Sequence, residues 1–161
     1  MKQAGPLART PSSTPALSRK HIVVFADDEP GVLLALERSM RSEPYDLFLT
    51  TDPVKALDWI RSRPVTVLVS DFRMPEMDGR TLIELAFAHS PRTARILLTG
   101  FPGEEAVRRA REAGLLSVAA KPWNPKELMR TIRERIRERE LLDGLEPPAS
   151  PQGVALPSDS A

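Results

Sequence analysis

The sequence predicts an α/β fold built around a doubly wound, five-stranded parallel sheet. Two observations carry this prediction. Short runs of continuously apolar residues are typical of strands that are buried on both faces. These runs alternate with segments whose apolar residues recur at helical spacing. The expected strands cover residues 21–26, 45–50, 65–69, 95–98 and 115–120.

The first two strands are each followed by a recognisable helix start. Residues 21–26 are apolar after the histidine, and apolar residues then recur at helical spacing from Val32 to Met40. Pro30 precedes that pattern, where proline is tolerated. After the strand at 45–50, Asp52 and Pro53 are typical of an N-cap and a first helical residue. Val54, Leu57 and Ile60 are expected to face one side of this second helix.

The remaining strands continue the same alternation. The strand at 65–69 is rich in β-branched residues, and the helix after it has apolar residues between Leu82 and Phe87. The strand at 95–98 leads to a helix that Glu104 and Glu105 open and Gly114 closes. After the strand at 115–120, Asn124 and Pro125 indicate another capped helix start. Its expected buried stripe is Leu128, Met129, Ile132 and Ile136.

Composition sets the limits of the folded part. Proline and serine concentrate at both ends of the 161-residue chain, and neither end shows apolar periodicity. Such segments cannot bury enough surface to offset the entropy lost on ordering. The sequence therefore predicts one domain over residues 20–142, with disordered tails at 1–19 and 143–161.

Charge and cysteine content exclude several classes of protein. The chain has no cysteine, which excludes disulfides and thiolate metal sites. With 23 basic and 22 acidic residues, it gives no electrostatic reason to expect binding to nucleic acid or membrane. No segment has the apolar length of a signal peptide or a membrane helix, so a cytoplasmic protein is expected. His21 and His89 lack metal-ligand spacing and are expected to be solvated.

Polar side chains fall at the carboxyl ends of the expected strands. Asp27 and Asp28 follow the first strand, Asp71 the third, Thr99 the fourth and Lys121 the fifth. In doubly wound sheets, ligands bind beyond this edge. Three neighbouring carboxylates repel one another and favour a hard cation such as Mg²⁺. A dication beside a lysine attracts a phosphoryl group, and a carboxylate such as that of Asp71 can act as its nucleophile.

These positions and their surroundings resemble the receiver domains of bacterial two-component response regulators. The matching text is FADDEP, LVSDFRMPEMDG, ILLTG and AAKPW, within roughly residues 20–142. The RMP, LTG and KPW segments look like a receiver subgroup often joined to phosphodiesterase-type or transcription-activating outputs. The resemblance implies a flavodoxin-like sheet with strand order 2-1-3-4-5.

The resemblance also implies a role for each site residue. Asp71 would be phosphorylated by a sensor histidine kinase or phosphotransfer protein. Mg²⁺ would be held by Asp28 and Asp71, by Asp27 mainly through water, and by the backbone carbonyl of Arg73. Lys121 would pair with the phosphoryl group and precede a cis bond to Pro122. Thr99 would move towards a phosphoryl oxygen, and Met74, Pro75 and Gly79 would shape the loop after the acceptor.

One position departs from the family pattern. The usual switch aromatic lies three residues before the lysine, where this chain has Val118. Valine has little reach and few rotamers. The coupling from Thr99 to the fourth helix, fifth strand and fifth helix is therefore expected to differ from that of aromatic-bearing relatives.

Three functions are compatible with a site of this kind. The leading one is a stand-alone receiver, because no output domain fits in the 19 residues after Leu142. It would not be an enzyme, apart from promoting its own phosphotransfer and dephosphorylation, and it would signal through an unidentified downstream protein. A Mg²⁺-dependent phosphatase or phosphotransferase commonly carries an acid two residues after its nucleophile, where this chain has Arg73. A pseudo-receiver would not need the intact acidic pair, acceptor, threonine and lysine.

The last helix leaves a further question open. It outruns its apolar stripe, which stops near Ile136 or resumes weakly at Leu141 and Leu142. The extra turns suit either a stalk in a homodimer or a former linker to an output domain.

Overall fold

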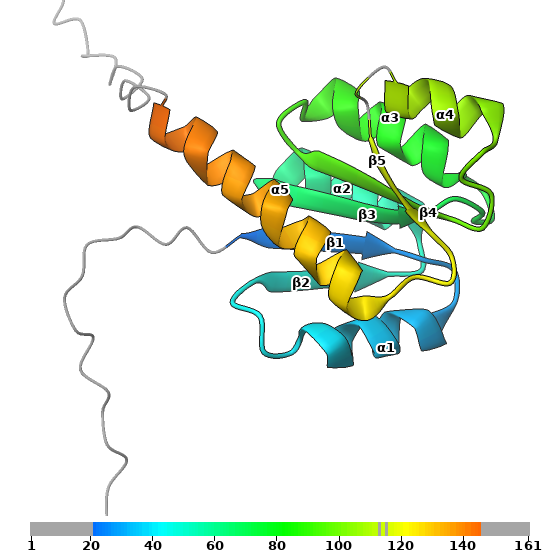
Figure 1. The fold of residues 1–161 in the computed structure, drawn as a ribbon, viewed down its shortest axis with the longest axis horizontal. Helices are drawn as coiled ribbons and strands as arrows, with labels where there is room; N and C mark the ends of the chain where they lie inside the picture. The colour runs from blue at the N-terminus through cyan, green and yellow to red at the C-terminus, as the bar shows by residue number, and fades with distance from the viewer. Residues whose placement is uncertain (1–20, 113, 115, 146–161) are drawn as a thin grey trace, which may run out of the picture.

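A computed structural model describes residues 21–112, 114 and 116–145 (Figure 1). Five strands alternate with five helices. The strands are β1 (Ile22–Ala26), β2 (Asp46–Thr50), β3 (Val65–Asp71), β4 (Ala94–Thr99) and β5 (Ser117–Ala120). The helices are α1 (Pro30–Met40), α2 (Pro53–Ser62), α3 (Gly79–His89), α4 (Glu105–Glu112) and α5 (Pro125–Leu145). All pairings are parallel, in the order β2-β1-β3-β4-β5, which confirms the predicted fold and strand order.

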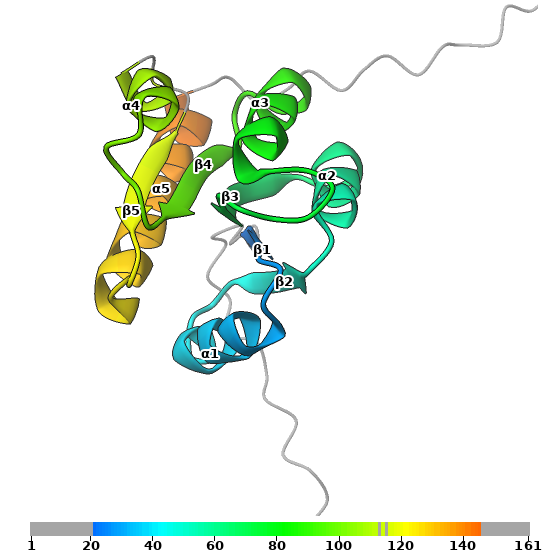
Figure 2. The same cartoon turned by 90° about the vertical axis from the view of Figure 1, so that its right-hand side faces the viewer.

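The sheet is the middle of three layers (Figure 2). Successive strand residues point to opposite faces, so Val24 and Leu68 pack on one face while Val23 and Val67 pack on the other. Helices α2, α3 and α4 cover the first face, and α1 and α5 cover the second. Because both faces are covered, strand β3 is buried along its whole length.

Short polar side chains begin the helices and so fix the loops at one edge of the sheet. Asp52 Oδ1 accepts a hydrogen bond from the Val54 amide at 2.9 Å, and Pro53 is the first residue of α2. Asn124 Oδ1 likewise accepts from the Lys126 amide at 2.9 Å before α5. Both caps match the sequence prediction. The cap of α3, in which Asp78 accepts from the Thr81 amide at 2.7 Å, was not foreseen.

Some predicted boundaries and environments were wrong. Strand β3 continues two residues past 69, because Ser70 and Asp71 are buried and stay paired with β4. Strand β5 begins at Ser117, where its pairing with β4 begins, so Leu116 lies before it, and residue 115 of the predicted strand lies outside the described residues. His21 is not solvated: its side chain is 15% exposed and its ring bridges Thr66 Oγ1 and Glu140 Oε1, each at 3.0 Å.

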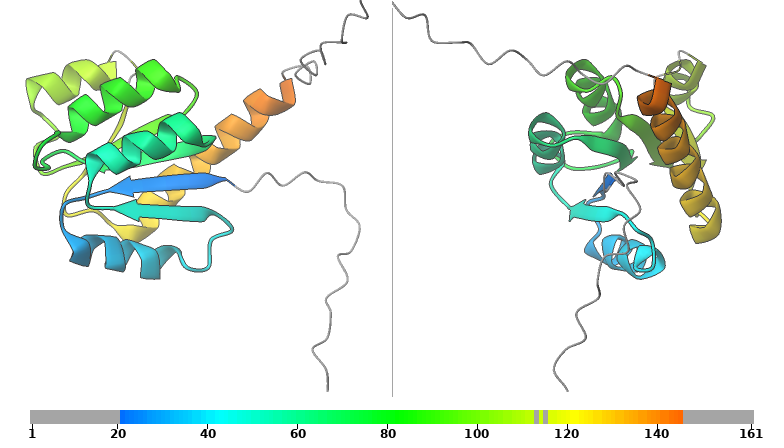
Figure 3. Two further views of the ribbon diagram at one scale, coloured as in Figure 1. Left: turned by 180° about the vertical axis from the view of Figure 1, so that it is seen from behind. Right: turned by 90° about the vertical axis from the view of Figure 1, so that its left-hand side faces the viewer.

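The C-terminal boundary also differs. Helix α5 has 21 residues and continues through Leu145, so residues 143–145 of the predicted tail are helical. The rest of that segment and residues 1–19 lie outside the described residues. The final turns extend past the body of the domain (Figure 3). Within the described part of the chain, no helix is both long enough and apolar enough to cross a membrane.

Ion pairs fasten α5 to the edge of the sheet opposite the carboxyl ends of the strands. Arg139 Nε lies 3.0 Å from Asp143 Oδ1, and its guanidinium also donates to the Arg92 backbone carbonyl at 2.9 Å. Arg92 pairs with Asp143 directly. Closer to the start of α5, Arg133 pairs with Glu43 in the loop before β2. The contacts that Arg139 and Asp143 make with Arg92 support the helix beyond Ile136, where its apolar stripe stops.

The Glu43–Arg133 pair leads to a prediction about pH. The hydrogen bond from Arg133 lowers the pKa of Glu43 below its ordinary value of 4.5. A carboxyl group with a lowered pKa stabilises the fold above the unfolded-state pKa, and this stabilisation is lost as the pH falls through the folded-state pKa. Glu43→Gln is therefore expected to be less stable than the parent near neutral pH. Urea unfolding should show the difference shrinking as the pH falls below about 4.5, and a pH-independent difference would contradict this account.

Candidate functional site

The topology brings the chemically interesting residues to the carboxyl edge of the sheet. Asp27 directly follows β1, Asp71 ends β3, Thr99 ends β4 and Lys121 directly follows β5. The parallel register places these ends together, because Asp71 lies opposite Leu98 and Thr99 lies opposite Ala120. The sequence prediction that these residues share one edge is confirmed.

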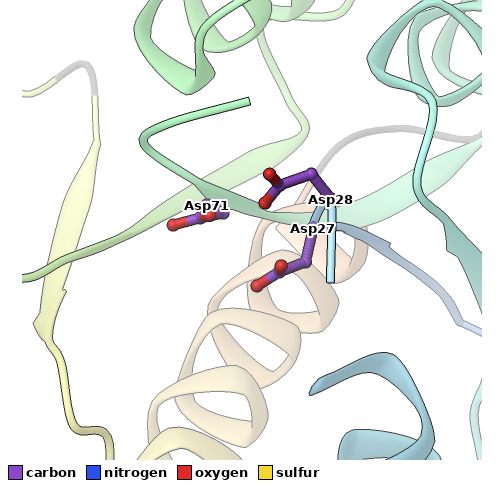
Figure 4. Close-up of side chains that lie close together, drawn as sticks. All are labelled: Asp27, Asp28 and Asp71. Carbon is purple, nitrogen blue, oxygen red and sulfur yellow. The ribbon is translucent and has the colours of Figure 1, made fainter. Parts of the chain in front are cut away.

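Three carboxylates gather at this edge (Figure 4). One oxygen each of Asp27, Asp28 and Asp71 can be chosen such that all lie within 4.8 Å of one another. Asp27 is 1% exposed and Asp71 is 7% exposed, whereas Asp28 is open to solvent. The cluster therefore has a buried floor and one accessible side.

Lys121 supplies the positive charge of the site. Its Nζ atom lies 2.7 Å from Asp71 Oδ1 and 3.8 Å from Asp27 Oδ2. Burial alone would lower the pKa of Lys121, but the hydrogen bond and the charge of Asp71, with the charge of Asp27, raise it above its usual value. The ammonium group is therefore charged at neutral pH. The bond between Lys121 and Pro122 is cis, as the family resemblance implied.

One buried oxygen of the carboxylate cluster has no hydrogen bond within the protein. Asp27 Oδ1 accepts from the Glu29 amide at 2.9 Å, but Oδ2 is buried and has no hydrogen bond, since Lys121 Nζ at 3.8 Å is too distant. Burial first, and then the charge of Asp71, raise the pKa of Asp27 above its ordinary value. A buried carboxylate oxygen without a partner is costly. An oxygen-only donor set of this kind fits Mg²⁺.

The carboxylate of Asp71 is held on one side only. Its Oδ1 atom accepts from the Phe72 amide at 2.9 Å and from Lys121. Its Oδ2 atom has no hydrogen-bond partner among the described residues. One oxygen is thus fixed and the other is free to react or to bind a cation.

Gly79 lies against the end of β3 and so positions Asp71. Its amide donates to the Phe72 carbonyl at 2.8 Å, which draws the start of α3 against the end of β3. A Cβ atom on Gly79 would lie only 2.0 Å from the Asp71 carbonyl oxygen. Only glycine allows this approach.

Thr99 and Arg73 border the site. Thr99 is 1% exposed, and its Oγ1 atom accepts from the Phe101 amide at 3.0 Å. Arg73 is exposed, and its guanidinium lies over the Phe101 ring, 5.4 Å from the centroid. The sequence reasoning missed Phe101. The available signal was its place two residues after Thr99, in a loop that leaves the same edge of the sheet.

Comparisons with known proteins agree with this geometry. A family model described as "Response regulator receiver domain" matches residues 23–133. The cyclic di-GMP phosphodiesterase response regulator RpfG of Xanthomonas campestris is 33% identical over 132 residues, covering 74% of this chain and 35% of that protein. The hydrogenase transcriptional regulatory protein HoxA of Cupriavidus necator is 30% identical over 121 residues, covering 74% of this chain and 25% of that protein. This chain therefore spans about a third or less of these curated relatives.

A solved structure supports the same assignment. The signal receiver domain of an HD domain-containing protein from Pseudomonas fluorescens has a TM-score of 0.74 and 28% sequence identity, covering 83% of this chain and 98% of that one. The narrower KPW-type subgroup stays a prediction. From the matched residues, the fold and the shared carboxyl-edge site, this chain belongs to the response regulator receiver domain family, whose members act as signalling switches.

Proposed function

We infer that this domain accepts a phosphoryl group on Asp71 and signals through contacts that depend on this modification. The observation that carries the inference is the 2.7 Å pair between Asp71 Oδ1 and Lys121 Nζ, set beside two further carboxylates. A carboxylate that is paired on one oxygen and free on the other is suited to nucleophilic attack. The ammonium group is placed to stabilise the charge that arrives.

The side chains that would hold Mg²⁺ are Asp27, Asp28 and Asp71, with the backbone carbonyl of Arg73 as a further ligand. When bound, the metal would neutralise charge on the phosphoryl oxygens and on the acceptor. The unsatisfied Oδ2 atom of Asp27 supports this assignment, because a cation would give it a partner.

The chain's own residues would carry the transfer. A free oxygen of Asp71 attacks the phosphorus of a phosphohistidine on a sensor histidine kinase or phosphotransfer protein. An O–P bond forms as the P–N bond breaks, and the imidazole keeps the electron pair. Lys121 holds the incoming oxygens, and the Thr99 hydroxyl donates a hydrogen bond to one of them. The same groups would let the domain promote its own phosphotransfer and dephosphorylation.

The wider assignments are part of the same proposal. The functional unit is the domain at 20–142, together with the last helical turn to Leu145, in a cytoplasmic protein. Its output passes to a downstream protein that the sequence does not identify, and a homodimer through the last helix is one arrangement open to test.

Labelling of Asp71 tests the proposal directly. Incubation with acetyl phosphate and Mg²⁺ is expected to add one phosphoryl group, detected by intact mass, and chelation of the metal should prevent the addition. Asp71→Asn should remain unlabelled because the amide is not a nucleophile of this kind. Asp78→Asn is the matched control, since asparagine can still cap α3.

Two outcomes would contradict the proposal. Repeated turnover of a phosphomonoester would indicate a phosphatase rather than a switch. Failure of acetyl phosphate and candidate kinases to label the folded chain would indicate partner binding without phosphorylation.

A further inference from the structure

Phe101 lies where the two loops that flank the acceptor meet. Its amide donates to Thr99 Oγ1 at 3.0 Å, which ties it to the end of β4. Its ring lies under the guanidinium of Arg73, two residues after Asp71. Phe101 is 61% exposed, so the core does not hold its ring in place. The Phe101 carbonyl also accepts from the Glu104 amide at 3.1 Å, so the backbone of Phe101 is held at both ends, and the ring itself contacts Arg73.

Both contacts involve a group that a phosphoryl group on Asp71 would attract, namely the Thr99 hydroxyl and the Arg73 guanidinium. The Thr99 hydroxyl can donate to a phosphoryl oxygen, and rotation about χ1 moves Oγ1 between discrete staggered positions. Such a rotation would take it away from the Phe101 amide. A guanidinium forms strong charge-assisted bonds with phosphoryl oxygens, whereas its contact with an exposed ring is weak. Phosphorylation adds about −1.5 to −2 charges beside both groups at neutral pH.

The neighbouring strand offers no equivalent reporter. Val118 on β5 is half-buried and packs with the cluster that contains Leu116 and Leu97. Its branched side chain has restricted χ1 rotamers and no polar atom. The chain's single tyrosine, Tyr45, lies just before β2, at the opposite edge of the sheet.

We propose that Phe101 is the aromatic residue that reports the state of the acceptor to the α4 side of this domain, with Arg73 holding it in the resting position. This inference rests on the phosphorylation of Asp71 proposed above. Loss of the Arg73 contact frees the ring, and loss of the Thr99 bond frees the Phe101 amide. A hollow of about 510 Å³ beside the ring, lined by Arg73 and residues 100–104, gives it space to move.

Fluorine NMR of the full chain tests the proposal. Labelling with 4-fluorophenylalanine gives one resonance for each of the five phenylalanines. Phe87→Leu and Phe101→Leu assign two of them. Phe87 is a matched internal control, because it is 41% exposed and has the Arg95 guanidinium 4.8 Å from its ring centroid, on α3.

With acetyl phosphate and Mg²⁺, the Phe101 resonance should shift and the Phe87 resonance should not. Arg73→Ala should move the resting Phe101 resonance towards its phosphorylated position without any phosphoryl donor. Val118→Ala should leave the phosphorylation-dependent shift of Phe101 intact.

The possible failures are distinguishable by mass. The chain could gain the phosphoryl mass while the Phe101 resonance, like that of Phe87, does not shift. That result would overturn only the proposed role of Phe101. A chain that gains no mass would overturn the proposed phosphorylation, and this inference with it.

Discussion

Gly79→Ala is expected to lower the free energy of unfolding by about 1–3 kcal/mol, the usual cost of overpacking. The new Cβ would lie 2.0 Å from the Asp71 carbonyl oxygen and 3.0 Å from Leu97 Cδ1. The oxygen belongs to backbone that is paired in β3, so α3 and the end of β3 must move apart. Because the acceptor sits on that end, acetyl phosphate labelling should slow by roughly a hundredfold, as a displacement near 1 Å can cause.

Gly31→Ala is the matched control for this substitution. Gly31 lies in α1, and a Cβ atom there would meet nothing within 4 Å. Alanine should therefore stabilise the helix, by up to about 1 kcal/mol. Urea unfolding and labelling rates of the two variants separate the steric clash from a general effect of losing a glycine. Equal stability and equal labelling of both variants would show that Gly79 does not position the acceptor.

Asp27→Asn is expected to make the metal-free domain more stable. It is also expected to reduce the stabilisation that Mg²⁺ adds. Asparagine can keep the hydrogen bond from the Glu29 amide while it removes a buried charge beside Asp71. A gain of about 0.5–2 kcal/mol is typical when a destabilising functional group is replaced. In the parent, Mg²⁺ at a hundred times its dissociation constant should add about 2.7 kcal/mol. The variant should gain much less at the same concentration.

Thermal unfolding with and without Mg²⁺ measures both effects. Asp52→Asn serves as the control, because this exposed cap lies outside the carboxylate cluster and asparagine also caps helices. An unchanged Mg²⁺ response in Asp27→Asn would exclude Asp27 from the metal site. A metal-free variant that is less stable than the parent would show that the carboxylate is needed for packing rather than for binding.

The sequence predicted the parts of the fold that depend on local pattern. Buried parallel strands are continuously apolar, and the caps at Asp52 and Asn124 use the residue types that N-caps favour. The end of β3 was missed because Ser70 and Asp71 are polar. Their burial comes from pairing with β4, which is a long-range contact.

The residues of the site were predicted from the sequence, but their burial and charge interactions were not. Parallel topology brings strand ends together, so Asp71 and Lys121 could be placed at one edge from the sequence. The sequence did not show that Asp27 is buried and Asp28 exposed, because that depends on how the chain turns after β1. The ring of His21 bridges Thr66 and Glu140, which lie 45 and 119 positions further along the chain. No local pattern indicates such a bridge.

Helix α5 connects the two edges of the domain as one rigid rod. It starts four residues after Lys121 and runs past the opposite edge of the sheet (Figure 1). Its 21 residues span about 30 Å at the helical rise of 1.5 Å per residue. The ion pair of Arg133 with Glu43 and the hydrogen bond from Arg139 to the Arg92 carbonyl hold this helix against the domain at two points. A small tilt at the lysine loop would therefore be magnified at the far tip, where Leu141 and Leu142 are exposed.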